Sequence, residues 1–556
     1  MRSFGQSTPA DPNIASAATP FGIDDMKQQT FNRLSVALAL IGVFLLACGE
    51  QALSEAPKVR PPAVAGAFYP ADPKALAKMV DEFLARAVVE RTTGSVLAVI
   101  SPHAGYEYSG HVAAHSYALL KGRKIERVVV IAPCHVDAFS FSSVYDGDAY
   151  ATPLGNIPVD KEFARRLAAL DPRIKLSGRG HGEVAGRGEH ALEVQLPFLQ
   201  RVLGPFRLVP IVMGDQNYDL SRALGVSLAK LMQGTNTLIV ASSDLSHFHP
   251  YDEAVRLDRK TLNAVEEWDY FNMSRNFERR IWEACGGGPI VAAMIAAERL
   301  GANRAKILKY ANSGDVTSEK GGVVGYGAVA LVAERRAAGQ KTPEFSLRQR
   351  EKDELLRIAK KSVEIAVKER TLYKCAAPGI ASLEQDRGAF VTLKKKGQLR
   401  GCIGYIAPAK ALYLTVRDVA AAAAVEDPRF EPVMPSELGD LEYEISVLSP
   451  LRRVTDVKQI QVGRHGLIVN KGNYEGLLLP QVPTEQRWDR MTFLEQTCVK
   501  AGLPTSAWKD EETDIFSFTA LVFGEHKLTE LSAPEGPPYQ EPRERQGQRG
   551  PDFPRP

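Results

Sequence analysis

Three short apolar runs, each followed by a histidine, constrain the fold of this chain more than any other feature. The runs are rich in β-branched residues and end in polar segments, which is typical of buried β-strands. Each predicted strand would therefore deliver a histidine at its carboxyl end. The runs are 95–100, followed by His103; 128–131, followed by His135; and 238–240, followed by Asp244 and His247.

The carboxyl ends of parallel strands share one edge of an open α/β sheet, and such sheets hold their ligands at that edge. We therefore expect the three histidines to lie on one rim. A single histidine in such a place is usually a structural residue with its hydrogen bonds satisfied. Three of them on one rim predict a functional site.

The segment from 61 to 335 alternates strand-like runs with amphipathic helical patterns. This alternation predicts an α/β domain with a mostly parallel sheet that is covered by helices on both faces. The last strand of this domain is expected at 323–332. The helices are expected at 72–87, 163–170, 220–232 and 290–300.

A charged segment with glycine and proline, 336–345, predicts a linker to a second domain at 346–531. In that domain the predicted strands follow one another with helices between groups, which indicates an α+β fold. We expect the two domains to fold independently. The tail 532–556 is rich in Pro, Arg, Glu and Gln and is predicted to be disordered. The expected helices are 346–368 and 409–425, and the expected strands are 389–393, 399–406, 443–448, 466–470, 475–479 and 516–523.

The segment 26–48 has the pattern of a secretory signal peptide. Basic residues precede a short apolar run, and Leu-Leu-Ala-Cys48 resembles the bacterial lipobox, whose cysteine becomes lipidated. Residues 1–25 show no pattern, so they are either unstructured or a misassigned start before Met26. Residues 49–60 would be a tether. We expect a membrane-anchored lipoprotein on the periplasmic or extracellular side, or a cytoplasmic protein if the signal interpretation is wrong.

Composition excludes several classes of protein. The formal net charge of +3 is nearly neutral for 556 residues, so we expect no nucleic-acid partner. The six cysteines are thinly spread and form no Cys-x-x-Cys pair, which excludes a disulfide scaffold and a zinc finger. The chain is expected to be globular.

Cys285 is the third candidate ligand beside His103 and His135. It precedes a predicted helix, and a helix N-terminus favours a thiolate. Two imidazoles and one thiolate can hold a divalent transition metal and leave a position open. Cys134, directly before His135, could compete as a ligand. A second layer is available from Glu189, His190 and Glu193, in which His190 and Glu193 would share one helix face; the alternative is a surface or capping feature.

Several motifs within 61–335 resemble the MEMO family. They are Pro102-His103-Ala104-Gly105-Tyr106, Ala132-Pro133-Cys134-His135, Glu189-His190-Ala191-Leu192-Glu193, Ser242-Ser243-Asp244-Leu245-Ser246-His247, Cys285-Gly286 and Ala65-Gly66-Ala67-Phe68-Tyr69.

That family is similar in fold to class III extradiol dioxygenases of the LigB type, which hold non-haem Fe(II) with two histidines and a carboxylate. The resemblance implies that His103, His135 and Cys285 are the metal ligands, with Fe(II) as the preferred metal and copper as the alternative. It places Asp244 and His247 beside the metal, with His247 matching the acid/base histidine of the dioxygenases. Our catalytic candidates are therefore Asp244, His247 and His190, with Glu193 in the second layer. Dioxygenase chemistry is inferred here by analogy of fold.

The second domain resembles the AMMECR family, through Leu399-Arg400-Gly401-Cys402-Ile403-Gly404, Asp427-Pro428-Arg429-Phe430 and Leu479-Pro480-Gln481-Val482. Arg400 and Cys402 are its polar candidates; the alternative is a glycine-kinked strand whose side chains serve packing. The fusion resembles the AmmeMemoRadiSam arrangement, which implies a radical-SAM partner protein.

Two functions remain open at this point. The first is a metal-dependent oxidoreductase, resembling a dioxygenase, that acts on a small aromatic or phenolic substrate. In it His247 would move protons. The second is a non-enzymatic module that binds a metal or a protein. The substrate, which is either a small molecule or a protein, is not specified by the sequence.

Overall fold

The structure is a computed structural model that describes residues 56–90, 92–334 and 345–525, and from Lys58 onward they form one compact unit. The expected signal peptide with Cys48, most of the tether, nearly all of the linker and the tail 532–556 lie outside the described residues. None of the helices in the described part combines the length and the apolarity that crossing a bilayer requires.

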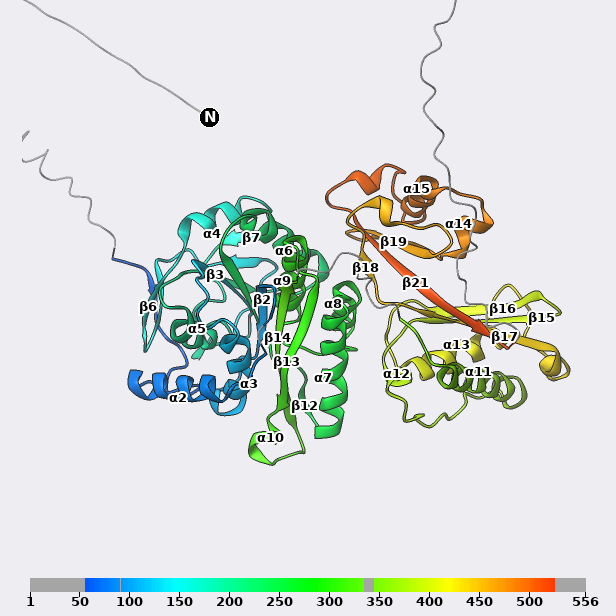
Figure 1. The fold of residues 1–556 in the computed structure, drawn as a ribbon, viewed down its shortest axis with the longest axis horizontal. Helices are drawn as coiled ribbons and strands as arrows, with labels where there is room; N and C mark the ends of the chain where they lie inside the picture. Colours follow the sequence, from blue (N-terminus) through cyan, green and yellow to red (C-terminus); the bar gives the residue numbers. More distant parts are fainter. Residues whose placement is uncertain (1–55, 91, 335–344, 526–556) are drawn as a thin grey trace, which may run out of the picture. The chain divides into compact units, whose positions relative to one another are not determined.

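A nine-stranded sheet forms the centre of the first half of the chain (Figure 1). Its strands are β2 (Ser95–Ser101), β3 (Arg127–Pro133), β4 (Ser142–Val144), β7 (Ile174–Leu176), β10 (Arg207–Met213), β11 (Thr237–Ser242), β12 (His247–His249), β13 (Arg304–Asn312) and β14 (Val323–Ala333).

The strand order is β12-β14-β2-β11-β3-β10-β4-β7, with β13 on the other side of β14. The four central strands β2, β11, β3 and β10 are parallel. The strands β12, β13 and β14 at one end are antiparallel, and so is the pairing of β4 with β10. The sheet is therefore mixed, whereas the sequence predicted a mostly parallel one.

Helices cover both faces of this sheet because the central strands are apolar on both sides. In β3, Val128 and Val130 belong to one core, and Val129 and Ile131 belong to the other. The first core packs against α2 (Pro73–Arg86), α3 (Tyr106–Ala118) and α5 (Leu196–Leu203). The second packs against α4 (Lys161–Ala168), α6 (Tyr218–Met232), α7 (Tyr251–Glu266), α8 (Tyr270–Glu278) and α9 (Gly287–Arg299).

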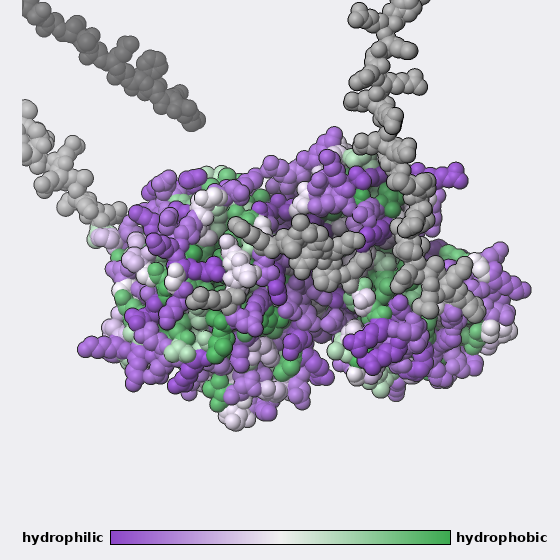
Figure 2. Space-filling model, in the orientation of Figure 1, coloured by the Kyte–Doolittle hydropathy of each residue, from purple (hydrophilic) through white to green (hydrophobic). Residues whose placement is uncertain are grey.

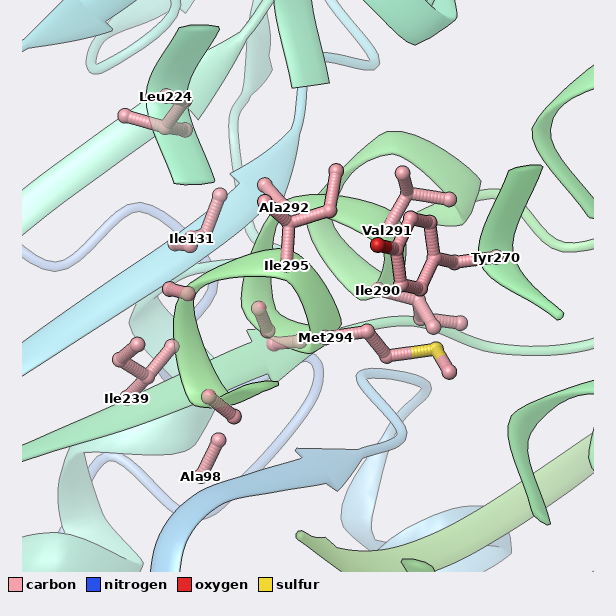
Figure 3. Packing of buried hydrophobic residues seen from close by; sticks show 14 of the residues in the cluster. Ala98, Ile131, Leu224, Ile239, Tyr270, Ile290, Val291, Ala292, Met294 and Ile295 are labelled. Carbon is pink, nitrogen blue, oxygen red and sulfur yellow. The ribbon is translucent and has the colours of Figure 1, made fainter. Parts of the chain in front are cut away.

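The helix α9 is buried within the second core, and Figure 3 shows the packing of its side chains. Its residues from Gly287 to Ala297 are all buried, and Ile290, Val291 and Ile295 pack toward the sheet and its neighbouring helices. A helix that is apolar all round is stable only in such a buried position. This burial fixes the beginning of α9, where Cys285 and Gly286 precede it.

The ordered fold begins earlier than the sequence predicted. Strand β1 (Val59–Arg60) pairs in parallel with β5 (Ala149–Thr152), which also pairs with β6 (Gly155–Pro158). The Arg60 side chain is buried and forms an ion pair with Glu193. Residues 59–60 therefore belong to the folded unit, although the sequence assigned them to a tether. A short hairpin, β8 (Glu183–Val184) and β9 (Arg187–Gly188), precedes Glu189.

The second half of the chain contains an antiparallel sheet with the order β16-β15-β17-β21-β19-β20, and β18 pairs with β21. Helices α11 and α13 form one core with the β15–β17 region, and α15 packs on a second one with β19. The strands of this half are β15 (Ala389–Lys395), β16 (Gln398–Tyr405), β17 (Leu441–Leu448), β18 (Arg452–Arg453), β19 (His465–Lys471), β20 (Tyr474–Leu478) and β21 (Asp514–Gly524). Its helices are α11 (Gln349–Glu369), α12 (Ala381–Glu384), α13 (Leu412–Val425), α14 (Gln481–Glu485) and α15 (Arg490–Lys500). The short helix α10 (Gly314–Thr317) belongs to the first half, between β13 and β14.

Buried contacts join the two halves. The core around α9 includes Leu448, Phe516 and Phe518 of the second half. Arg222 on α6 pairs with Asp514 on β21 at 2.6 Å, and both side chains are almost fully buried. The two halves thus share one apolar core. Independent folding of the two domains stays a prediction from the sequence.

Most of the apolar side chains are inside. On the face drawn in Figure 2, hydrophilic residues predominate and hydrophobic residues form small, separate patches. Scattered apolar residues of this kind are normal on a folded protein and do not by themselves mark a binding site.

Candidate metal centre

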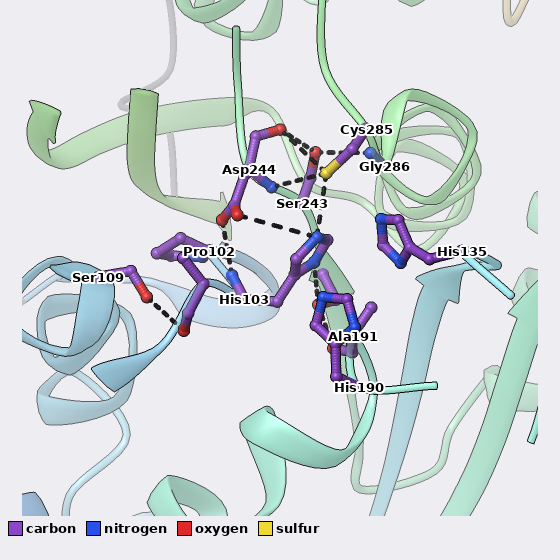
Figure 4. Close-up of polar contacts among 12 residues, drawn as sticks. Pro102, His103, Ser109, His135, His190, Ala191, Ser243, Asp244, Cys285 and Gly286 are labelled. Carbon is purple, nitrogen blue, oxygen red and sulfur yellow. Dashed lines mark hydrogen bonds and ion pairs between the residues drawn. The ribbon is translucent and has the colours of Figure 1, made fainter. Parts of the chain in front are cut away.

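The carboxyl ends of the central strands bring the predicted site residues together (Figure 4). His103 follows β2, His135 follows β3, and Asp244 follows β11, while Cys285 comes from the segment before α9. The prediction that parallel strands would deliver these side chains to one rim is consistent with their observed positions.

His103, His135 and His190 form a group that could hold a metal ion. Each offers one ring nitrogen, and these nitrogens all lie within 4.8 Å of one another. The ring centroids of His135 and His190 are 4.7 Å apart, and that of His103 lies 5.2 Å from His135 and 5.6 Å from His190. His190 precedes the short helix η1 (Glu193–Gln195) in an irregular segment.

A chain of hydrogen bonds fixes the tautomer of His103. Gln195 Nε2 donates to the carbonyl of Pro102 at 2.9 Å and to Ser242 Oγ at 2.8 Å. The Ser242 hydroxyl donates its own proton to the carbonyl of Ala191 at 2.6 Å. His103 Nδ1, 2.9 Å from Ser242 Oγ, must therefore be the donor of that hydrogen bond. In the neutral ring this leaves Nε2 with a free lone pair, which is the form that binds a metal.

A carboxylate sets the tautomer of His135 in the same way. His135 Nδ1 lies 3.2 Å from Glu189 Oε1, and an ionised carboxylate can only accept. Burial alone would raise the pKa of Glu189, but hydrogen bonds from His135 and the Ala191 amide outweigh it and lower the pKa to about 2. Glu189 is thus ionised and Nδ1 of His135 carries a proton, so in the neutral ring Nε2 is unprotonated.

Burial keeps two of these rings neutral. It is the largest cause that lowers the pKa of His103 well below its ordinary value, and the nearby His135 lowers it further. Burial, followed by the charges of His103 and His135, lowers the pKa of His190 to about 4. Neutral imidazoles are the ligand form of histidine. Among the described residues, no hydrogen bond holds the His190 ring, so its tautomer is not fixed.

Cys285 lies against the same ring. Its Sγ is 3.0 Å from His103 Nε2, and it accepts a hydrogen bond from the Asp244 amide at 3.2 Å. Burial, followed by the charge of Asp244, raises the pKa of the Cys285 thiol well above its ordinary value. The sequence had favoured a thiolate because of the helix N-terminus; in the absence of a metal, burial has the larger effect and Cys285 is a thiol.

Asp244 and His247 flank this group. Asp244 Oδ1 accepts the His103 amide at 2.7 Å, and Oδ2 lies 3.9 Å from His103 Nε2. Burial raises the pKa of Asp244, although the His103 amide and the charge of His247 act in the opposite direction. His247 Nδ1 donates to the carbonyl of Leu245 at 2.9 Å, which leaves Nε2 of the neutral ring free to accept a proton.

Glu193 does not face the metal group. Its carboxylate accepts hydrogen bonds from Arg60, Tyr69 and the amides of Ala63 and Val64. The expected helix face shared by His190 and Glu193 is wrong, because 189–192 precede η1.

Arg60 links this ion pair to the metal group, because it also donates to the Glu189 carbonyl. Glu193 therefore anchors the N-terminal segment and helps to hold the loop of Glu189 and His190.

Cys134 lies apart from the donor group. It is partly buried and packs against the core of the α2, α3 and α5 face, and its amide donates to the Met213 carbonyl at 3.0 Å. Burial raises the pKa of its thiol. The structure therefore gives Cys134 no contact that would make it a competing ligand.

Three residues that orient His103 were missed by the sequence analysis. They are Ser242, Gln195 and Tyr117, whose hydroxyl donates to Gln195 Oε1 at 2.5 Å. Ser242 was visible as the first residue of a quoted motif that follows the predicted strand 238–240, and Gln195 lay two residues after another quoted motif. Nothing in their local sequence indicated that they would meet across three elements.

The polar residues of the second half are paired with one another. Arg400 donates to Glu437 Oε2 at 2.9 Å, and this interaction lowers the pKa of Glu437 to about 2. The Cys402 amide donates to Asp427 Oδ2 at 2.8 Å, and Thr392 Oγ1 lies 3.3 Å from Cys402 Sγ. These contacts are consistent with a structural role for Arg400 and Cys402 in the β15–β16 hairpin.

The donor set fits a transition metal. His103 and His135 each donate a hydrogen bond from Nδ1, so the Nε2 of each neutral ring is unprotonated and can bind a metal. A carboxylate or hydroxyl behind a metal-ligating imidazole is the arrangement that metal sites commonly use. The neighbouring donors are the His190 ring and the Cys285 sulfur, and imidazole and thiolate suit iron, copper and zinc.

Comparison with known proteins divides the chain into the same two halves. A family model described as Memo-like protein matches residues 60–330, and one described as AMMECR1 matches residues 356–523. A solved structure of an uncharacterized protein, PH0010, from Pyrococcus horikoshii is 40% identical to this chain. That match covers 33% of this chain and 95% of that protein, with a TM-score of 0.31.

Curated relatives match the first half. A MEMO1 family protein from Aeropyrum pernix is 41% identical over 286 residues, which are 49% of this chain and 100% of that protein. A MEMO1 family protein from Methanopyrus kandleri is 38% identical over 287 residues, which are 49% of this chain and 98% of that protein. We conclude that this chain belongs to the MEMO1 family, with an AMMECR1 domain after its Memo-like domain.

Proposed function

We propose that the Memo-like domain binds one transition-metal ion through His103, His135 and Cys285, with Fe(II) preferred and copper as the alternative. The observation that carries the proposal is the pair of bare Nε2 atoms on His103 and His135, each fixed by a hydrogen bond on Nδ1. The Cys285 sulfur lies beside one of them. The MEMO1 family membership supports the same assignment.

Two side chains compete for the third ligand position. The Cys285 sulfur is 3.0 Å from His103 Nε2, and a metal would displace its thiol proton because a coordinating thiol is deprotonated. His190 belongs to the histidine group and also offers a neutral nitrogen. We favour Cys285, because His190 lacks a hydrogen bond that orients its ring among the described residues.

Metal content per chain after anaerobic reconstitution tests the ligand set. His103→Ala, His135→Ala and Cys285→Ala should lose stoichiometric metal, whereas His190→Ala should keep most of it. His115→Ala is the matched control, because His115 is partly buried on α3 and hydrogen bonds to the His111 carbonyl, outside the site. Normal metal in Cys285→Ala with loss in His190→Ala would replace Cys285 by His190. Normal metal in every variant would refute the site.

We further propose that the site supports an oxidoreductase that acts on a small aromatic or phenolic substrate. A redox-active metal bound there would supply one-electron chemistry and polarise an oxygen ligand. His247 is the proposed proton acceptor, because its Nδ1 is engaged by the Leu245 carbonyl and its Nε2 is free. Asp244 is the proposed second catalytic group; it holds the His103 amide and lies beside Cys285.

Oxygen consumption by the iron-loaded protein across a panel of catechols tests this reaction. The wild type should consume oxygen with at least one of them, and His247→Ala should keep its metal while losing turnover. An iron-loaded wild type that consumes no oxygen with any catechol would instead favour the non-enzymatic metal-binding module.

We also propose a radical-SAM protein as a partner. The support is the order of the two domains, Memo-like then AMMECR1, in one chain. Co-purification of tagged chain with a radical-SAM protein from the same genome should recover a complex; a lack of complex under anaerobic conditions would count against this partner.

A further inference from the structure

A hollow of about 420 Å³ lies between the two halves, away from the metal group. Its wall on the Memo-like side is Arg299, the last residue of α9. The other walls come from β18 and the segment after it, from the short helix η4 (Ala507–Lys509) and from the start of β21. Helix α9 separates this hollow from Cys285 by about 20 Å, at about 1.5 Å per residue.

Three residues that line the hollow carry buried donors without a hydrogen-bond partner. They are Arg299 Nε, Trp508 Nε1 and Thr513 Oγ1. Native proteins satisfy the great majority of buried polar groups, and an unsatisfied one indicates a missing ligand or water. Among the described residues, three of these unsatisfied donors belong to side chains that line the same hollow. They point to something that accepts hydrogen bonds there.

Arg299 shares its carboxylate partner with a second arginine. Asp514 Oδ2 is 2.6 Å from Arg222 Nε, and Asp514 Oδ1 is 3.4 Å from Arg299 Nη2. Arg222 also pairs with Glu512 at 3.3 Å. Glu511, the other acid in the lining, pairs with Lys230 at 2.8 Å.

Arg453 adds a further positive charge to the lining, although Glu298 pairs with it at 2.7 Å. Burial, followed by the charge of Arg453, lowers the pKa of Arg299. Desolvation and a neighbouring positive charge both disfavour the charged form of a buried guanidinium.

The rest of the lining is apolar. Val454, Val457 and Ile515 contribute aliphatic side chains, and Trp508 contributes an indole with Lys509 5.2 Å from its ring centroid. The volume of the hollow is within the range of small-molecule sites, roughly 300–1,000 Å³. A ligand for this lining would combine an oxyanion with an apolar body.

We propose that this hollow is a binding site for a small organic anion, whose carboxylate or phosphate group is held by Arg299 and Thr513 and whose body packs on Trp508. The site is separate from the metal centre, and the proposal does not depend on the chemistry there. Carboxylate and phosphate share the same recognition by Arg and hydroxyl donors, so the test has to tell them apart.

Isothermal titration calorimetry of the metal-free full chain, with inorganic phosphate in one arm and succinate in the other, tests the proposal. At least one probe should bind saturably at one site per chain. Arg299→Gln and Thr513→Val should each weaken that binding roughly 10- to 100-fold, since each removes a donor to a charged group. Arg304→Gln is the matched control, because Arg304 is exposed and pairs with Glu334 at the surface.

Binding of phosphate alone would identify a phosphate-bearing ligand, and binding of succinate alone a carboxylate-bearing one. The proposal is overturned if neither probe binds saturably, or if both Arg299→Gln and Thr513→Val bind like the wild type. It is also overturned if His103→Ala abolishes binding, because the anion would then sit at the metal group. If Arg299→Gln does not fold, Thr513→Val alone decides, since it keeps the charge and the shape of the side chain.

Discussion

At the scale of single residues, His103 shows how neutral groups prepare a metal ligand. Four hydrogen-bonding groups in sequence, Tyr117, Gln195, Ser242 and the ring itself, leave one choice for the position of the ring proton. The direction of these hydrogen bonds is determined by the carbonyl groups of Pro102 and Ala191, which can only accept. The lone pair on Nε2 is thus set by residues that do not touch the metal.

Ser242→Ala should weaken metal binding without removing a ligand. Loss of the hydroxyl releases the His103 ring and its tautomer, and losing such an outer partner typically lowers metal affinity about 10- to 100-fold. The measurement is the dissociation constant of the metal by competition with a chelator. Ser221→Ala is the control, because the Ser221 hydroxyl is also buried but has no hydrogen-bond partner within the described part of the chain. Equal affinities of Ser242→Ala and the wild type would contradict this role.

The sequence predicted the positions of His103 and His135 because strand ends determine them, and strand ends can be recognised locally. The orientation of Glu193 could not be predicted in that way. It depends on Arg60 and Tyr69, more than 100 residues earlier in the chain, and residues 49–60 have the composition of a tether. His190 was named as a catalytic candidate, but its closeness to both other histidines depends on a loop without a periodic pattern.

At the scale of elements, the start of α9 places Cys285. Gly286 lies so close to β11 that a Cβ there would be 2.2 Å from the Ser242 carbonyl oxygen and 2.7 Å from Ser243 Cβ. Its amide also donates to Ser243 Oγ at 2.9 Å. The backbone of Ser242 cannot move far enough to relieve such a clash. Only glycine therefore lets the start of α9 approach the strand and place the Cys285 sulfur next to His103.

Gly286→Ala should therefore displace Cys285 and lower metal content while the rest of the fold persists. We expect less than half of the wild-type metal per chain, measured after anaerobic reconstitution, with a near-native circular dichroism spectrum. Gly321→Ala is the control, because nothing lies within 4 Å of a Cβ at that position. Wild-type metal content in Gly286→Ala would show that Cys285 tolerates this shift or is not a ligand.

The sequence predicted three of the four central strands and β14 as elements, whereas β10 and the short strands at the ends of the sheet were not predicted. Strands β2, β3, β10 and β11 are six or seven residues long and apolar, so their sequence pattern is strong. Strands β4, β7 and β12 have three residues each, too few for a period to show. The antiparallel pairing of β14 with β2 depends on the returning chain, which no local pattern specifies.

At the scale of the whole molecule, the two halves are joined by buried polar contacts as well as by the core around α9. Arg222 Nε and the Tyr218 hydroxyl both bond to Asp514, at 2.6 and 2.7 Å. Trp282 Nε1 donates to Asp386 at 2.9 Å. Each of these contacts links the Memo-like half to the AMMECR1 half, so the second half contributes to the stability of the helices that carry the site.

Cutting the chain at a protease site inserted between residues 336 and 345 should leave the two halves associated on gel filtration. Asp514→Ala should separate them, because removing one partner of a buried ion pair costs roughly 3–5 kcal/mol. Asp510→Ala is the control, since Asp510 pairs with Lys471 within the same half at an exposed position. Separation of the halves without any substitution would favour independent domains.

Lipidation at Cys48 remains a prediction from the sequence. We expect metabolic palmitate labelling of the full-length chain and none of Cys48→Ala, because the basic and apolar segment before Leu-Leu-Ala-Cys has the pattern of a lipoprotein signal. Cys375→Ala is a suitable control, because Cys375 is a free thiol that lies far from the signal segment in the sequence. Equal labelling of Cys48→Ala and the wild type would refute the anchor.

The central claim is that one metal ion binds where the bare nitrogens of His103 and His135 meet. The most direct test is a crystal of the anaerobically reconstituted full chain with anomalous diffraction at the absorption edge of the added metal. The account predicts a single strong anomalous peak about 2.0–2.3 Å from His103 Nε2, from His135 Nε2 and from the Cys285 sulfur. A protein with stoichiometric metal whose peak lies elsewhere, or one that shows no peak between these histidines, would contradict it.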